Sequence, residues 1–421
     1  MFAFCLYKCY TLSMRRILHC DANNFYASVE CMLDTSLKDK YVAVSGNPDN
    51  RHGIILAKNQ KAKAMGVKTG ETIWEAKKKC PELVLVPPQY DEYVRISNKI
   101  FDIYCQYTDR VEPFGIDECW LDVTHSTKLF KSAENIAEEL RERVKKEIGI
   151  TISVGVSFNK IFAKLGSDMK KPDAVTVIDE DNYKQKVWPL DVGDLLMIGR
   201  HTQEKLRKIG INTIGDLANA PLKILTDKFG IVGEKIKQNA MGQNDEPVRL
   251  YYERPVPKSI GNSTTLPKDV SKREEAQAVI MALSEMVAVR LRRHSFVASG
   301  LHLGVKYNDL TYFGKQIKLP EKINSAGKLC DYAMRIYDEV PKRLPIRAFS
   351  VSTFDLSDGE ENVQLSLLDD IEKTEKLQRL DKSLDDIRKK YGYGALKSAA
   401  VLEFPHITDD LEDSDFKPFK K

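Results

Sequence analysis

Three acidic residues of this sequence lie in apolar surroundings. Asp21 ends the strand-like run Ile17–Cys20, and the adjacent Asp117 and Glu118 lie between apolar neighbours. Burying a carboxylate without a partner is costly, so such positions need compensation. Mg²⁺ can supply it because it prefers carboxylate and phosphate oxygens, and two ions together support an in-line displacement at phosphorus. A helix cap, a turn or a salt bridge is the simpler alternative for each residue taken alone.

The elements that must position these carboxylates mix strands and helices. Residues 15–21 and 151–157 are predicted as strands, and the chain turns helical from Phe25. A Lys-rich helical region is expected over 57–80, and an amphipathic helix over 133–148. The first part of the chain therefore predicts an α+β core rather than a regular βαβ array.

The predicted secondary structure changes twice in the later part of the chain. Residues 180–243 are predicted as short helices joined by glycines, and the prolines within 253–258 indicate a linker. Beyond it a separate α+β module is expected, followed by a charged helix near 371–390. The predicted strands and helices of this module are Ser299–Tyr307, Arg347–Phe354, Lys272–His294 and Asn324–Glu339.

Three motifs resemble those of a known enzyme family. Cys20–Glu30 (CDANNFYASVE) resembles the opening motif of the Y-family DNA polymerases in its UmuC-like form, and Ile116–Glu118 resembles the second acidic motif. Ser153–Pro172 matches a third signature. The motifs follow the family's order over roughly residues 14–370, so the sequence is identified as a member of the Y-family, close to its UmuC-like branch.

The resemblance implies the fold of a multidomain right-hand polymerase. This α+β architecture would have a palm, fingers, a helical thumb and an additional α+β little finger. The expected boundaries are an appendage at 1–13, palm at 14–33 and 90–178, fingers at 34–89, thumb with helix-hairpin-helix at 179–245, linker at 246–257, little finger at 258–357 and C-terminal tail at 358–421.

The resemblance also implies the chemistry. Asp21, Asp117, Glu118 and the carbonyl of Ala22 would hold two Mg²⁺ ions, with Mn²⁺ as a substitute. The primer 3′-hydroxyl would attack the α-phosphate of a deoxynucleoside triphosphate, and pyrophosphate would leave. Low-fidelity translesion synthesis without proofreading is expected.

The same resemblance assigns substrate-binding residues. Tyr26 matches the steric gate that excludes a 2′-hydroxyl, with Phe25 beside it. Lys63 and Lys171 match positions that contact the triphosphate, whereas Gln60 replaces a tyrosine of the DinB-like branch. Most of the other lysines between 58 and 79 are interpreted as solvated surface.

Contacts to DNA and to a sliding clamp are predicted outside the catalytic motifs. Gly199, Gly230 and Gly233 belong to segments that resemble helix-hairpin-helix turns, which bind phosphates through backbone N–H groups. Ordinary glycine capping of a helix competes with this interpretation at the second turn. A bacterial clamp-binding peptide is predicted from its residues Gln364, Leu365, Leu367 and Leu368.

The charge distribution fits a nucleic-acid contact followed by a peripheral tether, and a solvated surface with uneven charge is an equal alternative. The net charge is +4, and 18 Lys+Arg against 12 Asp+Glu make residues 246–357 basic, whereas 11 against 16 make residues 358–421 acidic. The eight cysteines contain no C-x-x-C pair, so reduced thiols in a cytoplasmic protein are expected.

We expect a monomer without a signal peptide or membrane segment, and Met14 is an alternative start. A non-catalytic clamp-bound scaffold and a nucleotide cyclase are the rival hypotheses.

Overall fold

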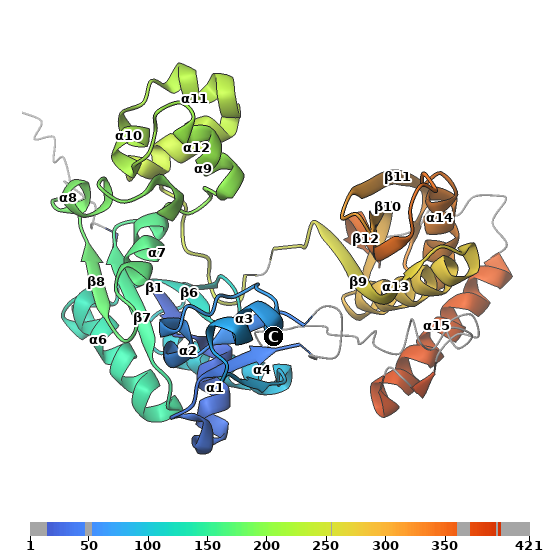
Figure 1. Ribbon diagram of the computed structural model, residues 1–421, viewed down its shortest axis with the longest axis horizontal. Helices are drawn as coiled ribbons and strands as arrows, with labels where there is room; N and C mark the ends of the chain where they lie inside the picture. Colours follow the sequence, from blue (N-terminus) through green and yellow to red (C-terminus); the bar gives the residue numbers. More distant parts are fainter. Residues whose placement is uncertain (1–14, 47–52, 254, 360–370, 393–394, 397–421) are drawn as a thin grey trace, which may run out of the picture. The chain divides into compact units, whose positions relative to one another are not determined.

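The computed structural model describes residues 15–46, 53–253, 255–359, 371–392 and 395–396. The chain divides into two compact units, and the boundary lies between Arg254 and Pro255 (Figure 1). Prolines at 255 and 257 lack a backbone N–H group, which disfavours regular structure at this point. Both units contain helices and sheets, as the α+β prediction requires.

A five-stranded sheet forms the centre of the first unit, in the order β5-β6-β1-β7-β8. Its members are Ile17–Ala22 (β1), Val111–Pro113 (β5), Glu118–Asp122 (β6), Ile152–Ser157 (β7) and Val175–Ile178 (β8). The strand β1 pairs antiparallel with both β6 and β7 and is buried along its whole length. Successive side chains of β1 therefore enter two different cores, one on each face of the sheet.

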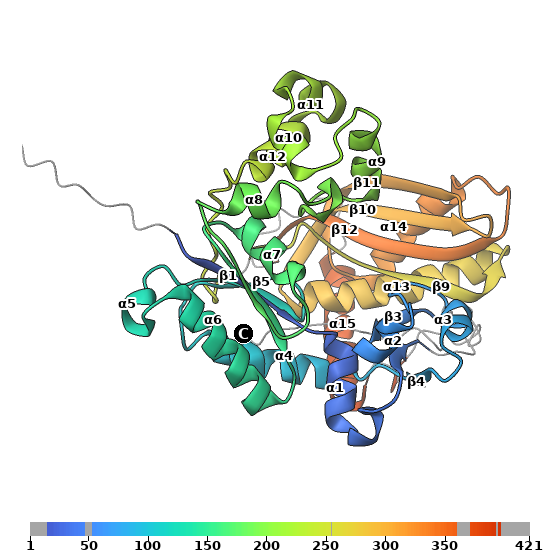
Figure 2. The same ribbon diagram turned by 60° about the vertical axis from the view of Figure 1, so that its left-hand side comes forward.

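Helices cover both faces of this sheet (Figure 2). They are Phe25–Leu33 (α1), Tyr90–Tyr104 (α4), Thr127–Phe130 (α5), Ala133–Arg143 (α6), its π-helical continuation Val144–Ile148 and Lys160–Met169 (α7). The helix α7 starts after Asn159, whose side chain accepts a hydrogen bond from the Phe162 N–H group at 2.8 Å. The predicted helix over 133–148 is thus confirmed, with a wider last turn.

A small three-stranded sheet lies beside α1, in the order β3-β2-β4. Its elements are Val42–Ser45 (β2), Ile55–Lys58 (β3), Val84–Val86 (β4), Gln60–Ala64 (α2), Ile73–Lys79 (α3) and the 3-10 turn Thr35–Leu37. The prediction of one helical region over 57–80 is wrong. Gly66 and Gly70 adopt φ angles of +84° and +83° and separate α2 from α3, which begins at a capping box of Thr72 and Glu75.

Short helices follow the main sheet, as predicted for residues 180–243. They are Tyr183–Val187 (α8), the 3-10 turn Val192–Asp194, Arg200–Arg207 (α9), Ile214–Asn219 (α10), Leu222–Phe229 (α11) and Ile231–Ala240 (α12). Their apolar residues share a core with Ile161, Phe162 and Leu165 of α7. One face of α7 therefore belongs to this helical layer and the other to the sheet.

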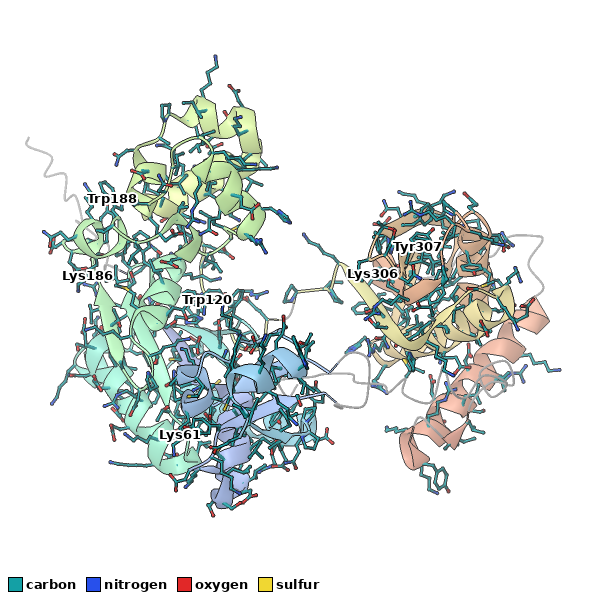
Figure 3. All side chains as sticks on the ribbon, viewed as in Figure 1. Lys61, Trp120, Lys186, Trp188, Lys306 and Tyr307 are labelled. Carbon is teal, nitrogen blue, oxygen red and sulfur yellow. The ribbon has the colours of Figure 1, made fainter. Side chains whose placement is uncertain are left out.

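The second unit is a four-stranded antiparallel sheet with helices, in the order β11-β10-β12-β9. Its elements are Ser259–Val270 (β9), Arg273–Arg293 (α13), Phe296–Tyr307 (β10), Tyr312–Ile323 (β11), Ala326–Asp338 (α14), Ile346–Asp358 (β12) and Ile371–Tyr391 (α15). Tyr307, labelled in Figure 3, is buried in the core and donates a hydrogen bond to the Pro341 carbonyl at 2.6 Å. The predictions of β10, β12, α13 and α14 are confirmed within a few residues.

The predicted charged helix near 371–390 is confirmed as α15. Charged side chains fasten it to α13: Arg292 Nε lies 2.6 Å from Asp385 Oδ2, and Arg388 Nη2 lies 2.8 Å from Glu285 Oε2. Both members of the second pair are largely buried. The helix α15 is therefore part of the second unit.

Candidate active site

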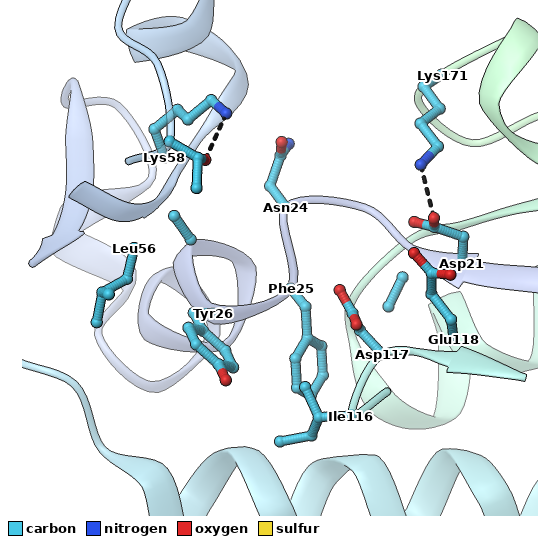
Figure 4. Close-up of a pocket in the computed structure, with 13 residues that line it drawn as sticks. Asp21, Asn24, Phe25, Tyr26, Leu56, Lys58, Ile116, Asp117, Glu118 and Lys171 are labelled. Carbon is cyan, nitrogen blue, oxygen red and sulfur yellow. Dashed lines mark hydrogen bonds and ion pairs between the residues drawn. The ribbon is translucent and has the colours of Figure 1, made fainter. Parts of the chain in front are cut away.

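Strand pairing brings the predicted carboxylates together at one end of the main sheet. Asp21 of β1 lies directly opposite Glu118 of β6 in the antiparallel register. Asp117 comes one residue before β6, and its carbonyl accepts a hydrogen bond from the Ala22 N–H group at 2.9 Å. Acidic residues that are almost 100 positions apart in the sequence thus share one site (Figure 4).

Two lysines of the α7 region face these carboxylates. Lys164 Nζ lies 2.9 Å from Glu118 Oε1 and 3.3 Å from Asp21 Oδ2. Lys171 Nζ lies 2.7 Å from Asp21 Oδ2 and 2.8 Å from Asp168 Oδ1. Charge-assisted contacts of this kind offset part of the cost of burying the two carboxylates.

A glycine in the third motif lets α7 approach the sheet this closely. A Cβ atom on Gly155 of β7 would lie 1.9 Å from the Ala163 carbonyl oxygen and 2.5 Å from the Ser167 nitrogen. Since both atoms belong to the backbone of α7, no side-chain rotation could relieve the clash. Gly155 therefore sets the distance between β7 and the helix that carries Lys164.

A buried histidine lies behind Glu118. His19 is fully buried on β1; its Nε2 atom is 3.3 Å from Glu118 Oε2, and its Nδ1 atom is 2.8 Å from Ser167 Oγ. Burial lowers the pKa of His19 to about 4, so the imidazole is neutral near pH 7. The neutral His19 ring thus lies behind Glu118 without adding a full positive charge.

The three carboxyl groups differ in their protonation behaviour. Burial raises the pKa of Asp21 to about 7 despite the opposing charge of Lys171. Burial and the neighbouring charge of Glu118 also raise the pKa of Asp117. Burial acts in the same direction on Glu118, but contacts with His19 and Lys164 outweigh it and lower the pKa to about 2. Additional positive charge at this site would stabilise the ionised forms of Asp21 and Asp117.

The donor set suits a hard divalent cation. Glu118 Oε2 is buried and accepts no hydrogen bond within the part of the chain that the structure describes. Carboxylate oxygens are the ligands that Mg²⁺ prefers. The described residues nevertheless contain no group of three acidic, histidine or cysteine side chains already arranged around a metal position. Lys164 and Lys171 instead neutralise Asp21 and Glu118.

A cavity of about 390 Å³ opens in front of the carboxylates. Seven residues predicted from the sequence line it: Asp21, Ala22, Phe25, Tyr26, Asp117, Glu118 and Lys171. Lys63, the eighth predicted residue for the nucleotide site, is exposed on α2 and does not line the cavity. Its charge nevertheless helps to lower the pKa of Lys58, after the larger effect of burial.

The structure adds cavity residues that the sequence analysis did not select. They include Lys58 and Thr69, whose side chains are joined by a hydrogen bond of 2.8 Å, and also Asn24, Leu56, Ala57 and Ile116. Lys58 lies at the end of β3, whereas Thr69 belongs to the loop that precedes α3. Thr69 reaches the cavity because this loop pairs with the first residue of β3. No local pattern in the sequence predicts that contact.

Aromatic side chains form part of the cavity wall and the layer behind it. The rings of Tyr26 and Tyr93 stack at a centroid distance of 4.2 Å with an interplanar angle of 13°. Tyr93 is fully buried, and its hydroxyl donates to the buried Glu30 carboxylate, which also accepts from Gln89 Nε2 at 2.7 Å. Burial raises the pKa of Tyr26 to about 12. The Tyr26 ring is thus held by a fixed partner.

A second buried ion cluster lies at the first residue of α7, one turn before Lys164. Lys160 Nζ is 2.9 and 2.8 Å from the two carboxylate oxygens of Glu112. These oxygens also accept hydrogen bonds from Arg249 Nη2 at 2.9 Å and from the Arg249 N–H group at 3.1 Å. The cluster fastens the segment that leads to the second unit against the main sheet.

The predicted DNA-binding glycines lie at helix ends. Gly199 directly precedes α9 and is exposed, whereas Gly230 lies between α11 and α12 with a φ angle of +60°. A Cβ atom on Gly233 would lie 2.3 Å from the Leu225 carbonyl oxygen. Close helix packing explains Gly233, and the Gly230 N–H group caps α11 through the Thr226 carbonyl at 2.8 Å. Contact with DNA at these positions remains a prediction.

Further predictions concern the clamp-binding peptide, the N-terminal appendage, the cysteines and membrane segments. The clamp-peptide residues Gln364, Leu365, Leu367 and Leu368 and the appendage 1–13 lie outside the described residues. Six cysteines are described, and all six are free thiols. Within the described ranges, no helix combines the length and the apolar character needed to span a membrane.

Family models match two parts of the chain. Residues 20–168 match the impB/mucB/samB family, and residues 257–367 match the C-terminal domain of the same family. The two matches together cover more than half of the 421 residues. The first contains all three acidic residues of the candidate active site.

Curated relatives match nearly the whole chain. The DNA polymerase IV of Acetivibrio thermocellus is 45% identical over 391 residues, which are 92% of this chain and 98% of the relative. DNA polymerase IV of Moorella thermoacetica is 37% identical over 92% of this chain and 96% of its own length. DNA polymerase IV 1 of Bacillus subtilis is 36% identical over 92% and 94%.

A solved structure has the same fold. The Dbh–Dpo4 chimera of a Y-family DNA polymerase aligns with a TM-score of 0.73 at 24% identity, covering 81% of this chain and 98% of the chimera. The fold, the two family models and the similarity to the relatives agree with the motifs found in the sequence. The chain belongs to the impB/mucB/samB family of proteins and is a Y-family DNA polymerase of the UmuC/DinB type.

Proposed function

We propose that this protein performs low-fidelity, template-directed DNA synthesis across damaged bases, by two-metal nucleotidyl transfer and without proofreading. The observation that carries the proposal is the convergence of Asp21, Asp117 and Glu118 in one cavity with Tyr26 and Lys171. Paired carboxylates beside a cation-lined cavity are suited to bind a metal-complexed triphosphate. The polymerase IV relatives support the same reaction class.

Domain roles follow from this proposal. The main sheet with α4, α6 and α7 corresponds to the palm, and the small sheet with α2 and α3 to the fingers. The helices α8 to α12 correspond to the thumb, and the second unit to the little finger followed by the tail. Residues 246–257, the expected linker, begin on the palm, where Arg249 is fastened to Glu112.

The carboxylates would hold Mg²⁺. Asp21, Asp117, Glu118 and the Ala22 carbonyl are the proposed ligands, and the bound ions would activate the primer hydroxyl and neutralise charge on the leaving pyrophosphate. Lys164 and Lys171 now occupy oxygens of Asp21 and Glu118, so these side chains have to move when the cation binds. Lys171 would then be available for the triphosphate.

The remaining cavity residues would orient the nucleotide. Tyr26, held by Tyr93, would lie beneath the sugar and leave no room for a 2′-hydroxyl, while Phe25 packs behind it. Lys58 and Lys171 would contact phosphate oxygens as point charges, and Lys63 would act from outside the cavity. Positioning and charge neutralisation account for most catalysis in phosphoryl transfer.

Contacts outside the cavity would hold the primer-template. Gly199 and Gly230 precede helices of at least eight residues, whose first N–H groups can bind phosphates. Basic residues of the second unit would add salt-dependent affinity, and Gln364–Leu368 would dock on a sliding clamp. We place the protein in the cytoplasm as a monomer associated with the nucleoid.

Primer extension tests the proposed function. Purified protein, a primed template, deoxynucleoside triphosphates and Mg²⁺ should give extension that follows the template sequence, with none from Asp117→Ala. Asp102→Ala, which alters an exposed carboxylate on α4, is the matched control and should extend normally. Binding of DNA by wild type without any extension would overturn the proposal and favour a non-catalytic scaffold.

A further inference from the structure

One large aromatic side chain of the fingers lies in solvent. Trp74 on α3 is 71% exposed, whereas Trp120 of β6 is 4% exposed. The Lys78 ammonium group lies 5.4 Å from the centre of the Trp74 ring, and Ile54 nearby in the fold is 41% exposed. An exposed indole beside a cation and another apolar side chain is a composition typical of a contact surface.

Backbone pairing connects this surface to the cavity. Residues 53–55 pair with residues 70–73 in a short antiparallel ribbon, in which the Ile55 N–H group bonds to the Glu71 carbonyl at 2.9 Å and Ile54 forms a bridge with Thr72. Lys58 and Thr69 lie just beyond one end of this ribbon, where a hydrogen bond joins their side chains, and both line the cavity. Ile54 and Thr72, two residues before Trp74, form the other end. The exposed surface therefore continues outward from the nucleotide site.

The charge around this surface favours an anionic partner. Residues 58–79 contain seven lysines and two glutamates. Both glutamates are engaged locally, since Glu75 completes the capping box of α3 and Glu71 pairs with Lys79. Lys77 and Lys78 are exposed on the same short helix as Trp74. Residues 58–79 therefore carry a net positive charge, and two of the seven lysines lie within four residues of Trp74.

We propose that Trp74 stacks on an unpaired base of the single-stranded template as it approaches the cavity. Ile54 would contact the same base, and Lys77 and Lys78 would contact its flanking phosphates. Every base offers a π face, so a single indole with adjacent cations suits single-stranded DNA of any sequence. A protein partner would require a much larger apolar area. The inference rests on the proposed polymerase function, because it requires a template strand.

The number of unpaired template nucleotides distinguishes an effect at Trp74 from an effect at the active site. Two primer-templates, with one and with six unpaired template nucleotides beyond the primer, are compared in binding and extension assays. For Trp74→Ala, the affinity for the long overhang should fall roughly tenfold, while the affinity for the short one changes less than about twofold. Trp74→Phe should lie between Trp74→Ala and wild type. Leu129→Ala, on the 80% exposed Leu129 of α5, is the matched control and should bind both primer-templates like wild type.

Fluorescence gives a readout that does not depend on catalysis. Oligothymidylate should quench wild-type emission more than that of Trp74→Phe, because stacking quenches indole fluorescence at the exposed position. Equal quenching of both proteins, or an equal loss of affinity for long and short overhangs in Trp74→Ala, would overturn the stacking site. Wild-type protein that extends neither template would count against the proposed function instead, whatever the quenching shows.

Discussion

The helix α7 contributes lysines to two buried ion clusters, one at its first residue and one a turn later, and the two clusters differ in how completely their charges are paired. At the first residue of the helix, each Glu112 oxygen accepts two hydrogen bonds, which come from Lys160 and Arg249. One turn later, Lys164 is shared between Asp21 and Glu118, and Glu118 Oε2 accepts none in the described part of the chain. We call these the closed cluster and the open cluster.

The difference separates a structural role from a chemical one. A fully hydrogen-bonded ion cluster leaves no oxygen for a ligand, so the closed cluster fixes the start of the linker on the palm. In the open cluster, burial raises the pKa of Asp21 and of Asp117 even though Lys164 and Lys171 lower both. Buried carboxylates in a cavity with perturbed pKa values are candidates for a functional site.

Breaking the closed cluster should have the largest effect on stability. Lys160→Met leaves the Glu112 carboxylate buried with Arg249 alone, so the free energy of unfolding should fall by about 3–5 kcal/mol. Urea denaturation followed by tryptophan fluorescence measures it, because all three tryptophans lie in the first unit. Lys128→Met, on an exposed lysine of α5, should change stability by less than about 0.5 kcal/mol. A loss below about 1 kcal/mol in Lys160→Met would remove the distinction between the clusters.

The corresponding change in the open cluster should respond to Mg²⁺. Lys164→Met removes a charged partner from Asp21 and Glu118 and should cost about 1–3 kcal/mol in the presence of EDTA. Millimolar Mg²⁺ should restore much of this loss, because the cation can replace the ammonium group at the carboxylates. Lys160→Met should show no such recovery. Equal responses of the two variants to Mg²⁺ would contradict the account.

The smallest effect is expected at the cavity residue that only the structure identified. Lys58→Ala removes one phosphate-directed charge, worth about 1 kcal/mol, so the KM for nucleotide should rise roughly fivefold with little change in kcat. Steady-state incorporation kinetics measure both constants. Lys61→Ala is the matched control on α2, since Lys61 Nζ pairs with Asp39 Oδ1 at 3.1 Å and does not line the cavity. An unchanged KM in Lys58→Ala would remove Lys58 from the nucleotide site.

The site was more predictable than the fold around it. Asp21, Asp117 and Glu118 were found because acidic residues seldom occur in apolar runs, and their motifs also matched a family. The roles of Lys58 and Thr69 depend on how residues 53–55 pair with 70–73, and that pairing is tertiary information. His19 looked like one more residue of the apolar run Ile17–Cys20. Its place behind Glu118 follows only from the pairing of β1 with β6.

Secondary structure was missed where periodicity was weak or misleading. The strands β9 and β11 were not predicted, because much of their length is exposed and their apolar residues do not alternate regularly with polar ones. The Lys-rich segment 57–80 has helical composition, but Gly66 and Gly70 turn the chain within it. Long helices such as α13 were predicted well because their apolar residues recur at helical spacing over several turns.

Single-turnover nucleotide incorporation by Asp117→Asn tests the central claim most directly. The substitution keeps the shape of the side chain and removes its charge. It relieves the burial cost indicated by the raised pKa of Asp117, so folding should be unharmed. We predict that the incorporation rate falls roughly a thousandfold while the affinity for primer-template changes less than about twofold. An incorporation rate within about tenfold of wild type would contradict the assignment of Asp117, and with it the open cluster, to catalysis.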